Sequence, residues 1–367
     1  MAPYCFLVGA PLLFSLFYNL KSDSPINQQL NKKKNYNILI FFSCLFLLLS
    51  LRSMDIGTDL SGYKTYFNYF GEISTEKVFG NYGYEMELGY KILNKITYVL
   101  GNKEFQFHLT VVAGICCASV ATLYYKESEN GVITILLFLT ATSIFDLMFS
   151  GLRQVIAIAL AVPTFYLVKN KKILWFLLCV FLATLFHKSA FIMLLLYPAY
   201  HIKLKPLHAV TLLAPAAVLI YLFRNQLFEL LLPLAGEDYV DKYGEVQNTG
   251  AITMIILIAM FVIFSFVVPD EEKMDDETIG LRNILSLSLI LQIFASTNFV
   301  AMRFNYYFLL FLPLTIPRII NRWQGDDKNS KLITNIVLIL FFAVYYFYRA
   351  FSDVDPLEIY PYSFFWQ

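Results

Sequence analysis

Residues 150–154 of this chain, Ser-Gly-Leu-Arg-Gln, place a guanidinium at the head of the apolar run Val155 to Val168. Insertion of an arginine at the centre of a membrane helix costs roughly 2.5–3.5 kcal/mol, and less near the helix end. Arg153 therefore needs an anionic partner, an interfacial position or a function. Arg52, His187 and Arg303 also stand at the ends of apolar runs, so Arg153 has companions.

The composition identifies the class of protein. Hydrophobic residues make up 58% of the chain and charged residues only 15%, and the mean hydropathy is +0.60. A soluble domain could not hide so much apolar surface in its core, so we expect an integral membrane protein. The net charge of +1 gives no global field that would attract nucleic acid, and we expect no such partner.

The apolar runs predict an all-α polytopic integral membrane protein, in one transmembrane domain over residues 1–367. Counting roughly 20 apolar residues as one span gives about twelve transmembrane helices, with 11 to 13 acceptable. The expected spans are about 3–20, 36–51, 105–125, 131–149, 152–168, 173–186, 189–202, 208–224, 251–268, 281–297, 303–318 and 332–350.

The distribution of basic residues predicts the orientation. Lysine and arginine are concentrated in the joints that follow the odd-numbered spans, such as 32–34 and 169–172, and these joints should face the cytoplasm. Both termini are then external. The large loop 52–104, a second loop at 225–250 and the four ionisable residues Arg52, Arg153, His187 and Arg303 share the external face, where they could form one cavity. Within the large loop, apolar residues recur at helical spacing over 88–100 and predict an interfacial helix.

Three arginines are candidates for binding an anionic group. Arginine offers a planar fork of donors that suits phosphate oxygens, and it stays charged where a lysine could lose its proton. Arg52, Arg153 and Arg303 converging on one cavity would suit a pyrophosphate. The alternative is that each arginine is an interfacial anchor beside an aromatic belt. Tyr63 and Tyr66, close behind Arg52, could form a platform for sugars.

The candidates for proton transfer are His187, Asp59 and Glu87. A neutral imidazole or a carboxylate at a dry external cavity could accept a proton from a hydroxyl. The alternatives are structural: Asp59 and Glu87 stand where helix caps are expected, and a single histidine at a helix end is commonly interfacial. No second ligand stands at zinc spacing, and no nucleotide-binding glycine loop is present, so we expect neither a metal nor a cofactor.

Short motifs along the chain resemble those of the EpsG-like branch of the Wzy-type bacterial polysaccharide polymerases. They are Arg52 with Gly57-Thr58-Asp59 and Tyr63, Glu87-Leu88-Gly89-Tyr90, Gly151-Leu152-Arg153-Gln154, Phe186-His187-Lys188-Ser189-Ala190, Arg303-Phe304 and the tail Tyr360-Pro361-Tyr362-Ser363-Phe364-Phe365. Together they run over nearly the full length.

The resemblance implies a GT-C-like membrane glycosyltransferase at the outer (periplasmic) face of the bacterial inner membrane. Such an enzyme moves a growing glycan from its undecaprenyl-pyrophosphate carrier onto the next lipid-linked repeat unit, to make O-antigen, capsule or exopolysaccharide. Arg52, Arg153 and Arg303 would then hold the pyrophosphate, and His187, Asp59 or Glu87 would activate the acceptor hydroxyl. Sugar contacts would come from Tyr63, Tyr66, Tyr90 and Gln154. Expected partners are the lipid-linked donor and acceptor, the bilayer and a chain-length regulator protein.

Two other functions are consistent with the same residues. A flippase or exporter for lipid-linked oligosaccharide would also need basic residues, but these should line a path through the bilayer rather than gather on one face. An O-antigen-ligase-type transferase would use the same donor with a different acceptor. Its acceptor choice would lie in loop details that residue spacing does not reveal.

Overall fold

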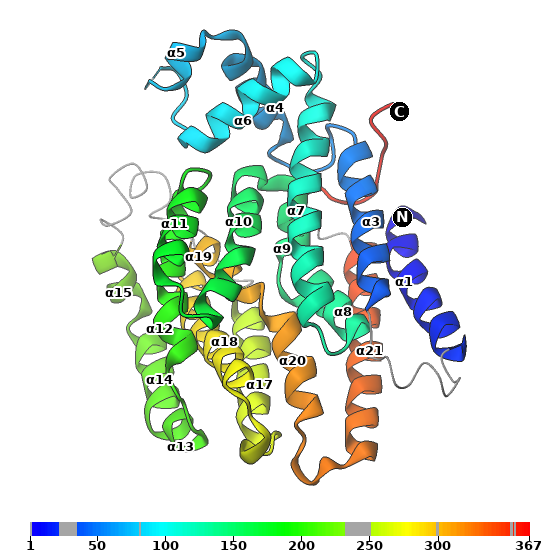
Figure 1. Cartoon of the computed structure of the whole chain (residues 1–367), viewed down its shortest axis with the longest axis vertical. Helices are drawn as coiled ribbons and strands as arrows, with labels where there is room; N and C mark the ends of the chain where they lie inside the picture. The colour runs from blue at the N-terminus through cyan, green and yellow to red at the C-terminus, as the bar shows by residue number, and fades with distance from the viewer. Residues whose placement is uncertain are drawn as a thin grey trace. The chain divides into compact units, whose positions relative to one another are not determined.

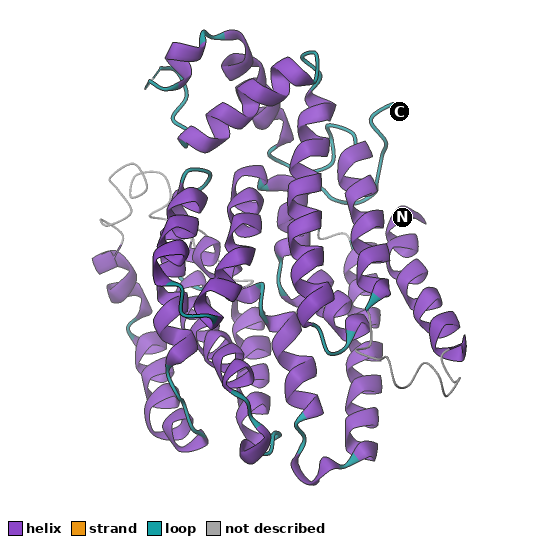
Figure 2. Ribbon diagram, in the orientation of Figure 1, coloured by secondary structure: helices purple, strands orange, loops and turns teal. Residues whose placement is uncertain are grey.

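Helices and short connecting loops make up the computed structural model of the chain, and no strand occurs among the residues it describes (Figure 2). The structure describes residues 2–21, 35–80, 82–231, 251–298, 301–352, 355 and 357–367. They form two compact units. The first comprises Met1–Leu167, Ile173–Phe191 and Val337–Gln367, and the second comprises Val168–Lys172 and Ile192–Ile336. The predicted all-α class is confirmed, and the predicted single domain over 1–367 stays a prediction.

The helices follow one another along the chain with short joints (Figure 1). Those wholly or mainly in the first unit are α1 (Ala2–Lys21), α3 (Tyr36–Leu51), α4 (Leu60–Glu72), α5 (Thr75–Val78), α6 (Leu88–Leu100), α7 (Phe105–Glu127), α8 (Gly131–Ala141), α9 (Ile144–Ser150), α10 (Leu152–Lys169), α11 (Ile173–Thr184) and α21 (Lys328–Phe351). Those of the second unit are α12 (Leu196–His201), α13 (Pro206–His208), α14 (Ala214–Leu222), α15 (Arg224–Leu231), α17 (Ala251–Val267), α18 (Asp276–Ala295), α19 (Met302–Leu309) and α20 (Leu312–Asn321).

Several helices are apolar enough to lie in a membrane. By length and composition, α7, α10, α18 and α21 could each cross it, and two bent pairs raise the number of candidate spans from four to six. Shorter apolar helices cover Ala2–Phe14, Tyr36–Leu51, Ile173–Thr184 and Ile252–Val267. The structure thus has four to six candidate spans among the described residues, which is consistent with a polytopic membrane protein, while the count of about twelve stays a prediction.

Some runs predicted as single spans are broken. The run 131–149 forms α8 and α9, which meet at an angle of 57°. At the break Ser143 has a left-handed backbone with φ of 56°, and the Thr142 hydroxyl donates to the Phe138 carbonyl at 2.8 Å, so side-chain bonding replaces the helical ladder. The run 303–318 likewise forms α19 and α20. Pro313 in the first turn of α20 has no N–H to continue α19.

Two other predicted segments differ from the expected form. The run 189–202 begins as a 3₁₀ helix, η1 (Lys188–Leu195), before α12. The run 208–224 continues into α15 after a bend of 78°, so the predicted loop 225–250 opens as a helix. The rest of that loop, residues 232–250, and the predicted cytoplasmic lysines 32–34 lie outside the described residues.

The large loop 52–104 is mostly helical. The predicted helix over 88–100 is confirmed with those bounds as α6, and α4 and α5 precede it. In Figure 1 these three helices gather at one end of α7. The polar face of α6 packs inward through Tyr90, Asn94 and Thr97, while Ile96 and Leu100 are exposed. An outward apolar stripe is the arrangement that an interfacial helix requires.

The first unit also holds the C-terminal tail against the chain segment after α3. The Ser53 N–H donates to the Ser363 carbonyl at 3.0 Å, and the Phe365 N–H donates to the Leu51 carbonyl at 2.9 Å. The Tyr362 hydroxyl donates to the Leu48 carbonyl at 2.7 Å. The last two bonds satisfy carbonyls in the final turn of α3, which the helix itself leaves without partners. Two of the predicted motifs, at Arg52 and at 360–365, are therefore adjacent.

The second unit is built around α18. This helix contacts α12, α14, α17, α19 and α20, and most of its residues are buried. Its interior is partly polar, because Asn305 of α19 accepts a bond from Ser288 at 2.8 Å and donates one to Gln292 at 2.7 Å. Polar side chains paired with one another in this way hold apolar helices in register.

Candidate functional site

An ion pair between Glu87 and Arg153 forms the centre of the candidate site. Glu87 ends the loop before α6, and Arg153 is the second residue of α10. The distance between Arg153 Nη1 and Glu87 Oε2 is 2.5 Å, and the side chains are 26% and 8% exposed respectively. The arginine therefore has the anionic partner that its position demands, while a quarter of its side chain remains exposed.

The second oxygen of Glu87 ties the pair to the turn that carries His187. Glu87 Oε1 accepts the backbone N–H of Lys188 at 3.2 Å. The Gly89 N–H donates to the Leu185 carbonyl at 2.7 Å, so the first turn of α6 lies directly against this turn. A Cβ on Gly89 would lie 2.7 Å from the Leu185 oxygen. The motif around Glu87 and the motif around His187 are thus joined by backbone contact, which only glycine permits.

The hydrogen bonds of His187 define its tautomer. The Ser189 N–H donates to His187 Nδ1 at 3.3 Å, and the Ser189 hydroxyl lies 2.6 Å from the same nitrogen. Because the backbone N–H can only donate, Nδ1 acts as an acceptor, and a neutral imidazole then carries its proton on Nε2. The ring is buried, with 6% exposure. His187 in this state suits hydrogen-bond donation to an anionic oxygen.

Tyrosines from α4 and the following loop surround the ion pair. Burial raises the pKa of Tyr63, and Arg153, which is hydrogen-bonded to it, opposes the rise while Asp59 adds to it. Tyr63 is therefore close to both charges and stays protonated. Its ring lies 6.3 Å from that of Tyr66, which in turn lies 4.9 Å from Tyr84. Tyr66 is half-buried and Tyr84 exposed, so the outer part of this cluster is accessible.

Tyr90 packs against the buried side of this tyrosine cluster. It is fully buried, with its ring 5.6 Å from that of Tyr63. Its hydroxyl lies 3.2 Å from His108 Nε2, and the Thr97 hydroxyl lies 2.8 Å from His108 Nδ1. Burial raises the pKa of Tyr90 well above its ordinary value. The structure thus gives a structural role to His108, which the sequence did not single out; its signal was a histidine within the apolar run of α7.

The remaining predicted residues of the first unit lie around these elements. Asp59 is exposed at the N-terminus of α4, where its backbone carbonyl accepts the Tyr63 N–H at 3.0 Å. Gln154 is buried beside Arg153 on α10. Arg52 is 1% exposed; it donates to the Met148 carbonyl at 3.2 Å and lies 5.4 Å from the centre of the Phe149 ring. The structure thus joins Glu87, Arg153, His187 and Tyr63, with Asp59 and Tyr66 beside them.

Arg303 belongs to the second unit. It lies half-buried in the first turn of α19, two residues before the buried Asn305. Its predicted convergence with Arg52 and Arg153 stays a prediction.

A second ion pair of the first unit joins α9 to α21 and was missed from the sequence. Arg349 Nη2 lies 2.7 Å from Asp146 Oδ2, with the side chains 30% and 11% exposed. The two residues are far apart in the sequence, and no spacing signal relates them. In the part of the chain that the structure describes, no three His, Cys, Asp or Glu side chains form a group that could hold a metal ion.

Comparison with models of protein families gives a match over most of the chain. The chain matches the family model of the EpsG family over residues 35–364, which covers every predicted motif apart from Phe365. No curated protein and no solved structure matches the chain. A match over most of the chain, from the residue before α3 to the tail that packs beside Arg52, shows the relationship, and the chain belongs to the EpsG family.

Proposed function

We propose that this protein polymerises undecaprenyl-pyrophosphate-linked oligosaccharide repeat units into a surface polysaccharide, at the external face of the bacterial inner membrane. Membership of the EpsG family suggests a polysaccharide polymerase-like function. The observation that carries the finer proposal is the Glu87–Arg153 ion pair, tied through the Lys188 N–H to the turn that holds His187. A fixed, partly open guanidinium suits a pyrophosphate leaving group.

The proposed reaction is a glycosyl transfer. The bond between the anomeric carbon of the donor glycan and its pyrophosphate oxygen breaks, and the lipid pyrophosphate leaves with the electron pair. A hydroxyl oxygen of the next repeat unit bonds to the same carbon and loses its proton to a carboxylate. Arg153 stabilises the negative charge that develops on the leaving group, and Glu87 holds Arg153 in position. Arg303 is a proposed second cation.

The other residues take roles that fit their surroundings. His187, with its neutral-state proton on Nε2, would donate to a pyrophosphate oxygen, as its bonds to Ser189 favour. Both oxygens of Glu87 are already engaged by Arg153 and the Lys188 N–H, whereas Asp59 is exposed and accessible to an acceptor hydroxyl. We therefore assign proton acceptance to Asp59. Tyr66 would contact sugars, with Tyr63 and Tyr90 supporting it.

Complementation of a strain that lacks its own polymerase tests the proposal. Arg153→Ala should reduce polymerisation by about 10²–10³-fold, the cost of removing one donor aimed at developing charge. Glu87→Gln should also shorten the glycan, because it leaves the guanidinium without its orienting charge. Glu76→Gln, at an exposed position of α5, is the matched control and should make long chains. Glycan length is read on a gel, with membrane expression measured for each variant.

The product pattern separates the proposal from its alternatives. A polymerase defect leaves single repeat units that are still exported and attached to their final acceptor. Loss of attachment, with long lipid-linked chains, would indicate a ligase-type transferase instead. Retention of repeat units on the cytoplasmic leaflet would indicate an exporter. Long chains of wild-type length from expressed Arg153→Ala would refute the assigned site.

A further inference from the structure

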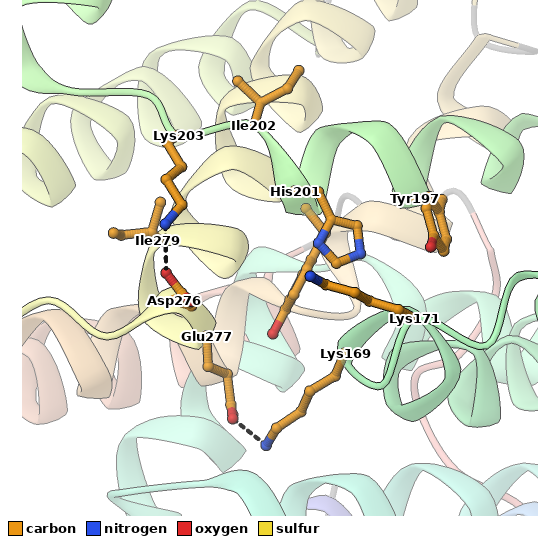
Figure 3. A pocket seen from close by; sticks show the side chains of 10 residues that line it. Lys169, Lys171, Tyr197, His201, Ile202, Lys203, Asp276, Glu277 and Ile279 are labelled. Carbon is orange, nitrogen blue, oxygen red and sulfur yellow. Dashed lines mark ion pairs between the residues drawn. The ribbon is translucent and has the colours of Figure 1, made fainter.

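A cavity of about 450 Å³ opens in the second unit, lined by residues other than those assigned to glycosyl transfer. It lies where the joint after α10 meets the end of α12 and the first turn of α18 (Figure 3). Its charged and basic lining side chains are Lys169, Lys171, His201, Lys203, Asp276 and Glu277. Basic residues dominate this lining, since three lysines and a histidine face two carboxylates.

Both carboxylates of the cavity are already neutralised. Glu277 forms ion pairs with Lys169 and with the buried Arg318. Asp276 pairs with Lys203 at 3.3 Å, and both of these side chains are largely exposed. Figure 3 shows the Lys169 and Lys203 ammonium groups turned toward these carboxylates. The charge of Lys171 therefore stays in excess, and Arg318 adds a further positive charge behind Glu277.

Lys171 lines the cavity from the turn that follows α10. It adopts a left-handed conformation with φ of 55°, and its N–H donates to the Val168 carbonyl at 3.0 Å. Its ammonium takes part in none of the ion pairs found among the described residues. In Figure 3 the Lys171 side chain extends across the cavity toward His201. A lysine ammonium has three donors to offer a ligand.

His201 lines the same side of the cavity as Lys171. Its Nε2 donates to the same Val168 carbonyl at 3.1 Å, which holds the ring at the cavity wall. Ile202, next in the chain, is 51% exposed, and Leu207 and Val210 beyond it are 69% and 71% exposed. Ile202 lines the cavity, so an apolar strip of exposed side chains, Ile202, Leu207 and Val210, starts at the cavity and continues along the chain. Charged donors beside an apolar surface match the two ends of an anionic phospholipid.

We propose that this cavity binds a phosphate group, supplied by the head group of an anionic phospholipid whose chains lie along the apolar strip. The lysine-rich joints 169–172 and 203–205 are those that the positive-inside rule assigns to the cytoplasm, where anionic lipids enrich the membrane surface. The proposal concerns residues separate from Glu87, Arg153 and His187, so it does not depend on the glycosyl transfer. A bound lipid would hold the joint 169–172 against α12 and α18 within the second unit.

Native mass spectrometry of the full chain in detergent tests this inference. Phosphatidylglycerol is titrated in, with phosphatidylcholine and inorganic phosphate in parallel. Loss of one lysine near an anionic surface costs about 1 kcal/mol, so Lys171→Gln should weaken phosphatidylglycerol binding about fivefold. Lys171→Arg should retain binding. Lys172→Gln is the matched control, because Lys172 is exposed next to Lys171 and does not line the cavity.

Each result has a defined meaning. Preferential binding of phosphatidylglycerol that only Lys171→Gln weakens supports a lipid head group. Displacement of that lipid by millimolar inorganic phosphate, again sensitive to Lys171→Gln, supports the phosphate site and assigns it to a soluble ligand. Equal binding of both lipids by the wild type, or equal behaviour of Lys171→Gln and Lys172→Gln, overturns the proposal.

Discussion

The contact between Gly89 and the Leu185 carbonyl gives the sharpest prediction for the candidate site. An alanine at position 89 would place its Cβ 2.7 Å from the Leu185 oxygen and 2.9 Å from Phe186 Cε2. The oxygen belongs to the backbone, so it cannot turn away as a side chain could. Reaching the 3.4 Å of ordinary van der Waals contact requires a displacement of about 0.7 Å between the start of α6 and the turn.

The displacement should affect activity more than stability. Overpacking costs about 1–3 kcal/mol, and alanine recovers about 1 kcal/mol of helix propensity relative to glycine. The net loss of stability is then about 0–2 kcal/mol. Glu87, two residues before Gly89, would move relative to Arg153 and His187, and a misplacement near 1 Å can cost about 100-fold in rate. We expect Gly89→Ala to reduce polymerisation by about 10–100-fold.

The assay combines glycan length in complemented cells with thermal unfolding of the purified protein. Gly62→Ala on α4 is the control, because the nearest atom to its new Cβ is Tyr66 Cε2 at 3.9 Å. We expect Gly62→Ala to polymerise like the wild type. If Gly89→Ala also made full-length chains, the backbone contact would not position the site, and the argument from Gly89 would be wrong.

Two further predictions concern stability. Tyr90→Phe removes the hydroxyl beside His108 Nε2, so a buried ring nitrogen loses its partner. The free energy of unfolding should fall by about 1–3 kcal/mol, measured by thermal unfolding. Tyr82→Phe, at an exposed position, should change the stability little, and equal effects of the two substitutions would contradict the buried network. Burial tends to raise the pKa of Asp275, but hydrogen bonds from Thr278 and Arg322 outweigh it and lower the pKa to about 2. A carboxylate with a lowered pKa stabilises the fold at pH values above its unfolded pKa of about 3.9, and this contribution is lost as the pH falls from about 3.9 toward 2. In Asp275→Asn, the midpoint temperature of unfolding should therefore fall less steeply than in the wild type over this pH range. An unchanged acid profile of Asp275→Asn would show that this carboxylate does not contribute.

The positions of most helices could be predicted from the sequence, because each position depends on local composition. The run 36–51 and the amphipathic pattern over 88–100 became α3 and α6 with the same bounds. Apolar length and spacing act within one helix, and they need no knowledge of its neighbours. The breaks between α8 and α9 and between α19 and α20 were not predicted, since a hydroxyl or a proline at the right point outweighs continuous apolar character.

The sequence by itself also identified Arg153, Glu87 and His187, because a charge or an imidazole at the end of an apolar run is costly enough to require an explanation. Only the tertiary structure decided which of them meet. It paired Glu87 with Arg153, placed the His187 turn against Gly89, and joined Tyr90 to a buried His108. It also matched Asp146 with Arg349 from opposite parts of the chain. Chemical type is a property of each residue alone, whereas an ion pair depends on distances that only the packing of several helices determines.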